Sequence, residues 1–146
     1  MSTVIHRLVA ACRAGAHEPM VAQVSSGWVV MGEQQVLPGY CLLLPDPVVP
    51  DLNALEGAAR TRFLAELALV GDALLKLTAA VRINYAIFGN VEPALHAHLF
   101  PRLPSEPSTI AKLQPFALDW AQAPKYSAAL CGDFKRRLAE DLRSRI

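Results

Sequence analysis

Two histidines, His96 and His98, are the residues of this sequence whose type and spacing could do chemistry. Alternate side chains of a β-strand point to the same face, so a strand here would present both imidazoles together. An imidazole titrates near neutrality: its neutral nitrogen can attack phosphorus, and its protonated form can donate to a leaving oxygen. The same spacing also fits a metal site or two histidines on a half-exposed strand, and spacing alone does not decide among the three.

A metal site would need a third ligand and groups that orient the ligands. His6, His17, Glu92 and Glu106 are the remaining candidates, and no motif places any of them beside the histidine pair. The sequence also lacks the glycine-rich patterns of the common phosphate-binding loops. We therefore predict no metal ion and no cofactor.

Hydrophobic periodicity and turn residues predict the elements that position this pair. In chain order these are a helix from Ser2 to Gly15, a hairpin over Met20–Met31, a strand over Tyr40–Leu44, a long helix from Asp51 or Asn53 to about Ala80, strands over Arg82–Asn90 and Leu95–Phe100, and a helix from about Ser127. This order predicts an α+β fold: an antiparallel sheet of about five strands, a long helix packed on it, and N- and C-terminal helices. Residues 1–146 are expected to form one domain.

Alternation also predicts which face of the histidine strand is buried. Leu95, Ala97 and Leu99 point away from the histidines and suit the long helix as a packing partner. The charged pairs of that helix, Arg62 with Glu66 and Asp72 with Lys76, lie four residues apart and indicate a solvated surface. The histidines would then face a cleft or solvent.

Composition excludes several classes of protein. Apolar residues make up 53% of the 146 residues and charged residues 18%, which argues against disorder. The net charge is +1, without a basic patch for nucleic acid. No apolar run reaches the ~20 residues of a membrane span. Three widely spaced cysteines predict buried free thiols, and we expect a cytoplasmic protein.

The residues around the histidines resemble the histidine triad (HIT) superfamily. Residues 94–102, ALHAHLFPR, are similar to its signature His-φ-His-φ-His-φ-φ, which is commonly followed by Pro-Arg. Residues 38–45, PGYCLLLP, are similar to its Pro-Gly-His strand, and Asn90 stands where the family often has an asparagine. Two positions depart from the pattern, because Ala94 replaces the first histidine and Tyr40 replaces the histidine of the Pro-Gly-His strand.

The resemblance implies a HIT-like fold and a role for each histidine. His96 matches the family's nucleophile, which forms a nucleotidyl-histidine at the α-phosphate of dinucleoside polyphosphates or nucleoside phosphoramidates. His98 matches the histidine that assists at the phosphate. The backbone carbonyl of Ala94 survives the substitution and can hold the Nδ1 proton of His96, which leaves Nε2 free to attack. The resemblance also implies a homodimer and a nucleotide substrate.

Four further residues are candidates for substrate binding. Asn90 and Arg102 are possible donors to the phosphate, although Arg102 is equally compatible with a solvent-facing end of the strand. Glu33 stands where relatives often have a group near the ribose, and it is also a plausible exposed turn residue. The Tyr40 hydroxyl can donate to a phosphate. Ala94 and Tyr40 keep open an alternative, a purine-nucleotide-binding or regulatory protein with weak or no turnover.

Overall fold

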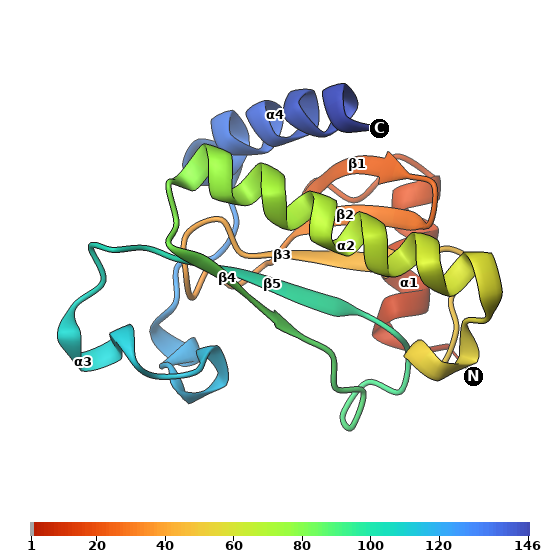
Figure 1. Cartoon of the computed structure of the whole chain (residues 1–146), viewed down its shortest axis with the longest axis horizontal. Helices are drawn as coiled ribbons and strands as arrows, with labels where there is room; N and C mark the ends of the chain where they lie inside the picture. The colour runs from red at the N-terminus through yellow and green to blue at the C-terminus, as the bar shows by residue number, and fades with distance from the viewer. Residues whose placement is uncertain (1) are drawn as a thin grey trace.

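The computed structural model describes residues 2–146, which form a sheet flanked by helices (Figure 1). The elements in chain order are α1 (Val4–Arg13), β1 (Met20–Val24), β2 (Gly27–Met31), β3 (Cys41–Pro45), η1 (Leu52–Ala54), α2 (Gly57–Thr78), β4 (Arg82–Ala86), β5 (Ala97–Arg102), α3 (Ser108–Ala111), η2 (Pro115–Ala117), η3 (Trp120–Gln122) and α4 (Ala128–Arg145). The predicted α+β class and the predicted order of elements are confirmed.

The five strands form one sheet in the order β1-β2-β3-β5-β4. Every neighbouring pair is antiparallel, as the short links between the first three strands predict. Strand β5 lies between β3 and β4, and His98 is opposite Leu42 on β3 and Ala86 on β4. The histidine strand is therefore held on both sides, which fixes the direction of its side chains.

Helices α2 and α4 cover one face of the sheet, and α1 packs on the opposite face at one end (Figure 1). Leu95, Ala97 and Leu99 are buried in the core that the sheet shares with α2, as predicted. The other face carries His98 and Phe100. The three cysteines are free and buried, also as predicted.

Two of the three predicted helix starts, those of α1 and α2, differ from the observed ones. Helix α1 is capped by Thr3 instead of Ser2, because the Thr3 hydroxyl accepts from the His6 amide while the His6 ring accepts from the Thr3 amide. Helix α2 begins at Gly57, because Asp51 caps a separate short 3-10 turn, Leu52–Ala54. Capping residues were thus recognised by type, but the neighbouring position or element took the role.

The predicted ends of two strands, β4 and β5, were also wrong. Strand β4 stops at Ala86, before the Asn90 that we expected to close it, and β5 starts at Ala97 and runs on to Arg102. Opposite β5, residues 87–90 lack a partner because the chain turns away there and Gly89 adopts a positive φ of 93°. His96 therefore lies just before the strand and His98 within it.

The prediction that the charged face of α2 is solvated is wrong at Glu66. Its side chain is not paired with Arg62 but is buried against the β1–β2 turn, where it accepts from the amides of Ser25 at 3.1 Å and Ser26 at 2.7 Å and from the Ser25 hydroxyl. Lys76 likewise pairs with Asp141 on α4 at 2.8 Å instead of with Asp72. Spacing along one helix could not reveal partners supplied by another element.

Within residues 2–146, no helix has the length and apolar character needed to cross a membrane.

Candidate active site

The histidines line a pocket of about 390 Å³ on the sheet face opposite α2 and α4. Helix α1 covers this face at one end, and the segment that carries η2 and η3 packs on it at the other. The pocket is lined by Phe88, Gly89, Asn90, Val91, Glu92, His96, His98 and Phe116. Of the four predicted site residues besides the histidines, Asn90 lines this pocket, whereas Tyr40, Arg102 and Glu33 do not.

The ring of His96 is oriented by its own backbone. Its Nδ1 lies 2.7 Å from the carbonyl oxygen of Ala94. A carbonyl oxygen can only accept, so Nδ1 carries the proton and donates it to this bond. In the neutral ring the lone pair is then on Nε2, as expected from the sequence even with alanine at position 94.

His98 is oriented by Tyr40, whose hydroxyl lies 2.7 Å from His98 Nδ1. Burial, together with the neighbouring His96, lowers the pKa of His98 to about 4, so the ring is neutral at pH 7. Burial raises the pKa of Tyr40, which keeps its proton. In the tautomer in which the Tyr40 hydroxyl donates to Nδ1, the proton of His98 is on Nε2, where it is available to a phosphoryl oxygen.

This contact gives Tyr40 a different role from the predicted one. Its ring is only 4% exposed and is stacked on Phe100 at 4.3 Å, so its hydroxyl meets His98 and not an incoming phosphate. Gly32 makes room for the ring, since a Cβ there would lie 2.2 Å from a Tyr40 ring carbon. Tyr40 acts on the site through His98.

Ala94 does not face the pocket. Its side chain is 1% exposed and lies in the cluster that contains Ile5 and Val9 of α1. A histidine side chain would be too large for this position unless the packing changed. The position that matches the first histidine of the family signature is thus part of a filled core.

The loop between β4 and β5 brings Asn90 into the pocket wall. Asn90 is exposed, and no hydrogen bond joins its side chain to another residue in the described part of the chain. Glu92 holds this loop to α1, because its carboxylate accepts from the Val4 amide at 3.2 Å. Asn90 is therefore available as a donor to a ligand.

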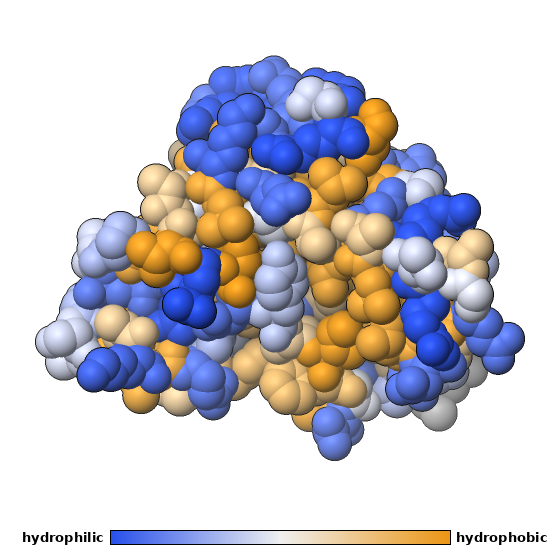
Figure 2. Space-filling model, viewed as in Figure 1, coloured by the Kyte–Doolittle hydropathy of each residue, from blue (hydrophilic) through white to orange (hydrophobic). Residues whose placement is uncertain are grey.

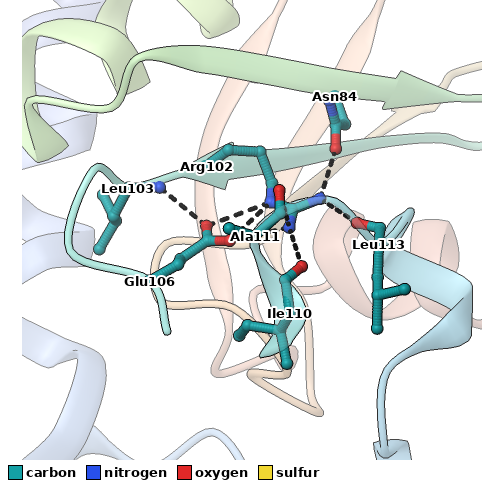
Figure 3. A network of polar contacts seen from close by, with 7 residues as sticks. All are labelled: Asn84, Arg102, Leu103, Glu106, Ile110, Ala111 and Leu113. Carbon is teal, nitrogen blue, oxygen red and sulfur yellow. Dashed lines mark hydrogen bonds and ion pairs between the residues drawn. The ribbon is translucent and has the colours of Figure 1, made fainter. Parts of the chain in front are cut away.

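Arg102 lies away from the histidines, at the far end of β5, in a buried polar network (Figure 3). Its side chain is 8% exposed, so it is neither a solvent-facing residue nor part of the histidine pocket. The guanidinium pairs with Glu106 at 2.8 Å and donates to Asn84 and to the carbonyls of Ile110 and Leu113. These bonds attach the segment after β5 to the sheet.

Glu106 completes this network. It accepts from the Leu103 amide at 2.8 Å as well as from Arg102. Burial by itself would raise the pKa of Glu106, but these hydrogen bonds outweigh burial and lower it. Each charged group is thus paired with protein atoms, which is the condition for keeping a buried ion pair.

Glu33, like Tyr40 and Arg102, does not line the pocket. It is exposed and lies with Pro19, Gln34, Lys125 and Tyr126 around a separate surface depression. Its backbone carbonyl accepts from the Tyr126 amide at 2.6 Å. The turn composition of residues 32–35 thus described its surroundings better than the family position did.

Three aromatic residues at the site were missed from the sequence: Phe88, Phe116 and Trp120. Phe116 and Trp120 lie in the proline-rich stretch, where no periodicity indicates a face. Large aromatic residues in a stretch without periodicity are a signal of binding surfaces, and this signal was present in the sequence.

Across residues 2–146, no three His, Cys, Asp or Glu side chains are grouped so that they could hold a metal ion. His17, one of the candidate third ligands, is close to Glu18, Glu33 and Lys135, and burial lowers its pKa. The metal alternative therefore lacks a ligand set in the described part of the chain.

Comparisons with solved structures place this architecture among known folds. A histidine triad (HIT) protein from Sinorhizobium meliloti matches with a TM-score of 0.69 at 21% identity, over 84% of this chain and 87% of that chain. A histidine triad protein from Marinobacter aquaeolei matches with a TM-score of 0.71 at 19% identity, over 99% and 98%. A hypothetical histidine triad nucleotide-binding protein from Sulfolobus tokodaii gives 0.73 at 12% identity, over 94% and 92%.

No protein-family model and no curated protein matches the sequence.

Proposed function

We propose that this chain, which has the histidine triad fold, is a nucleotide hydrolase or nucleotidyl transferase with His96 as its nucleophile. The substrate classes are dinucleoside polyphosphates and nucleoside phosphoramidates, attacked at the α-phosphate. One observation carries the proposal: the Nδ1 proton of His96 is held by the Ala94 carbonyl at 2.7 Å, which leaves the lone pair on Nε2. A nucleophile needs this tautomer.

The reaction has two steps. In the first, Nε2 of His96 forms a bond to the α-phosphorus while the bond to the leaving group breaks, and the leaving group takes a proton from water if it needs one. In the second, water attacks the same phosphorus and the N–P bond breaks, releasing the nucleotide and the free imidazole. An alcohol or another nucleotide in place of water gives transfer. Two easier displacements replace one difficult step.

Two donors face the charge that develops on the phosphoryl oxygens. His98 offers Nε2–H from a ring that stays neutral at pH 7, because its pKa lies at about 4. Asn90 lines the same pocket and has an amide that can donate. Fixed donors of this kind stabilise the transition state without reorganisation. The Sulfolobus tokodaii protein, which is named as nucleotide-binding, supports the nucleotide as the substrate class.

A substitution at His96 tests the proposal. We expect purified protein to release AMP from diadenosine polyphosphates or from adenosine 5′-phosphoramidate, and His96→Asn to lower kcat/KM at least ~100-fold. His17→Asn is the matched control, since His17 is outside the pocket. Equal turnover by wild type and His96→Asn would exclude His96 as the nucleophile.

The second candidate is the purine-nucleotide-binding or regulatory protein without efficient turnover. It is favoured by Ala94, which is 1% exposed in the core, because among residues 2–146 His96 and His98 are the only histidines that line the pocket. This candidate predicts saturable AMP binding by calorimetry and no product after prolonged incubation with either substrate class. Product formation that depends on His96 excludes it.

The homodimer is proposed for the α2–β4 face. Apolar side chains gather over the middle of this side of the molecule (Figure 2), and the exposed ones include Leu64 at 42% and Tyr85 at 46%. Strand β4 is an edge strand, and an antiparallel pair of such edges related by a two-fold axis is self-complementary. We expect light scattering to give twice the 15.8 kDa chain mass. Leu64→Glu should then shift it to one chain mass.

A further inference from the structure

Two phenylalanine rings stand in the mouth of the histidine pocket. Phe88, in the loop after β4, is 60% exposed, and Phe116, on η2, is 41% exposed. Their ring centroids are 5.2 Å apart with an interplanar angle of 90°. Exposed aromatic rings from two segments far apart in the chain thus meet at one point, although burying them would be favourable.

Both rings lie beside the proposed reacting groups. Phe116 meets the His98 ring edge-on at 5.1 Å, and Phe88 lies 6.5 Å from it. His96 is 5.0 Å from His98 on the same pocket wall. A ring attached to a phosphorus at His96 would therefore reach Phe88 and Phe116.

Phe116 is held in position before any ligand binds. It is stacked on Trp120 at 5.3 Å with an interplanar angle of 13°, and the Trp120 indole N–H donates to the Pro115 carbonyl at 3.1 Å. Trp120 also packs edge-on against Tyr40 at 5.6 Å. A ring that is already ordered loses little entropy when it contacts a ligand.

The pocket is poor in positive charge. In the part of the chain that the structure describes, none of its lining residues is lysine or arginine. The charged residue among them is Glu92, whose carboxylate already accepts from the Val4 amide. Arg102, which follows the histidine motif in the sequence, is outside this pocket and is bound to Glu106. A chain of several phosphates would need cations here, whereas an uncharged group would not.

We infer that Phe88 and Phe116 form a subsite for a planar, uncharged ring that the substrate carries beside the phosphorus attacked by His96. This inference rests on the proposed function and narrows its substrate class to singly charged phosphorus centres with an aromatic substituent. The ring belongs either to the leaving amine of a phosphoramidate or to the nucleotide base. Both present a flat π-face and an edge, and aromatic pairs prefer offset-stacked or edge-to-face contacts.

For a phosphoramidate the reaction balances without any other reagent. The bond from His96 Nε2 to phosphorus forms as the P–N bond to the amine breaks, and the amine leaves with a proton from water. Water then displaces the histidine, and the products are the nucleotide and the amine.

The test varies each ring in turn. Adenosine 5′-phosphoramidates of benzylamine and of cyclohexylmethylamine differ in the planarity of the leaving group. The benzylamidates of AMP and of ribose 5-phosphate differ in the base. We expect kcat/KM to favour the aromatic member of one pair, and Phe116→Leu and Phe88→Leu each to reduce that preference by about 3- to 10-fold, the size of an aromatic pair interaction.

Phe116→Tyr is the matched control, because it keeps the ring and should keep the preference. Comparing ratios between wild type and variant cancels the different intrinsic reactivity of the amines. The pair whose ratio changes identifies the leaving amine or the base as the occupant. Ratios that stay the same for both pairs in both leucine variants would overturn the subsite.

Binding to the His96→Asn protein separates this result from failure of the proposed function. Calorimetry with the same compounds should show the preference for the aromatic ring, and adding Phe116→Leu should remove it. Binding that depends on Phe116 without any His96-dependent turnover would support the subsite and contradict the proposed enzymatic function. His96-dependent turnover without any dependence on Phe116 would support the enzymatic function and contradict the subsite.

Discussion

The polar groups at the two ends of strand β5 differ in whether they keep hydrogen-bonding atoms free for a ligand. At one end, His96 and His98 each use Nδ1 in a hydrogen bond within the protein, to Ala94 and Tyr40, and leave Nε2 for the pocket. At the other end, Arg102 is bound by Glu106 and by surrounding oxygens. The two Nε2 atoms can therefore still form hydrogen bonds with a ligand, whereas the Arg102 guanidinium uses its hydrogen bonds within the fold.

The difference shows that a family position does not by itself make a residue functional. Arg102 follows the histidine motif directly, yet its guanidinium attaches the 103–113 segment to the sheet. That segment leads to Phe116, so the network acts on the histidine pocket only by placing its wall. We therefore expect changes at Arg102 to affect stability first and chemistry second.

The largest effect is expected for Arg102→Ala, on the free energy of unfolding. Removing one partner leaves the Glu106 carboxylate, 7% exposed, without its counter-charge, so the free energy of unfolding should fall by about 3–5 kcal/mol. Urea denaturation measures this. Arg136→Ala is the control: its pair with Asp133 is exposed and should contribute no more than about 1 kcal/mol. If Arg102→Ala were as stable as the wild type but bound nucleotide more weakly, Arg102 would be a ligand-binding residue and not a structural one.

The next effect concerns pH and His98. Its pKa of about 4 in the folded protein lies below the ~6.5 of an unfolded histidine, so the unfolded chain binds the proton first. The free energy of unfolding should therefore decrease as pH falls from about 6.5 to about 4, by up to about 3 kcal/mol, and this contribution should be constant outside that window.

His98→Asn provides the reference for this pH dependence, because an amide does not titrate and its oxygen can still accept from Tyr40. The difference between the two proteins isolates His98 from the carboxylates that titrate in both. Identical slopes between pH 4 and 6.5 would show that His98 is accessible to protons in the folded state.

The smallest effect is expected for Tyr40→Phe. This change removes the hydroxyl that lies 2.7 Å from His98 Nδ1 and keeps the stacked ring. kcat should fall about tenfold, the upper end of what one neutral hydrogen bond contributes, with little change in KM. Nitrogen NMR of His98 should show the proton on Nε2 in wild type and a mixture of tautomers in the variant. An unchanged tautomer would contradict the positioning role.

Much of the fold was predictable because the signals were local. Alternation in residues 95–99 predicted that Leu95, Ala97 and Leu99 pack on the long helix while the histidines face away, and the structure confirms this. The antiparallel sheet followed from short links between strands. Element ends were less predictable: His6 completes the cap with Thr3, and Gly89 turns the chain away from β5.

The site was predictable only in part. The hydrogen bond between His96 and the Ala94 carbonyl involves neighbours in sequence, so it could be anticipated. The partners of Tyr40, Arg102 and Glu66 come from other segments of the chain, and no spacing within one element indicates them. Phe88 lies in the loop after β4 and Phe116 lies on η2, and only the folded chain brings these two rings together.

The central claim is that His96 has a free, correctly placed Nε2, and trapping tests it most directly. Protein is mixed with adenosine 5′-phosphoramidate labelled in the α-phosphorus, denatured within the first turnover under mildly alkaline conditions that preserve an N–P bond, and digested for mass spectrometry. We expect an adenylyl group on the peptide that contains His96, and none on that peptide in His96→Asn. Label on His98, or product formation without label on any histidine, would contradict it.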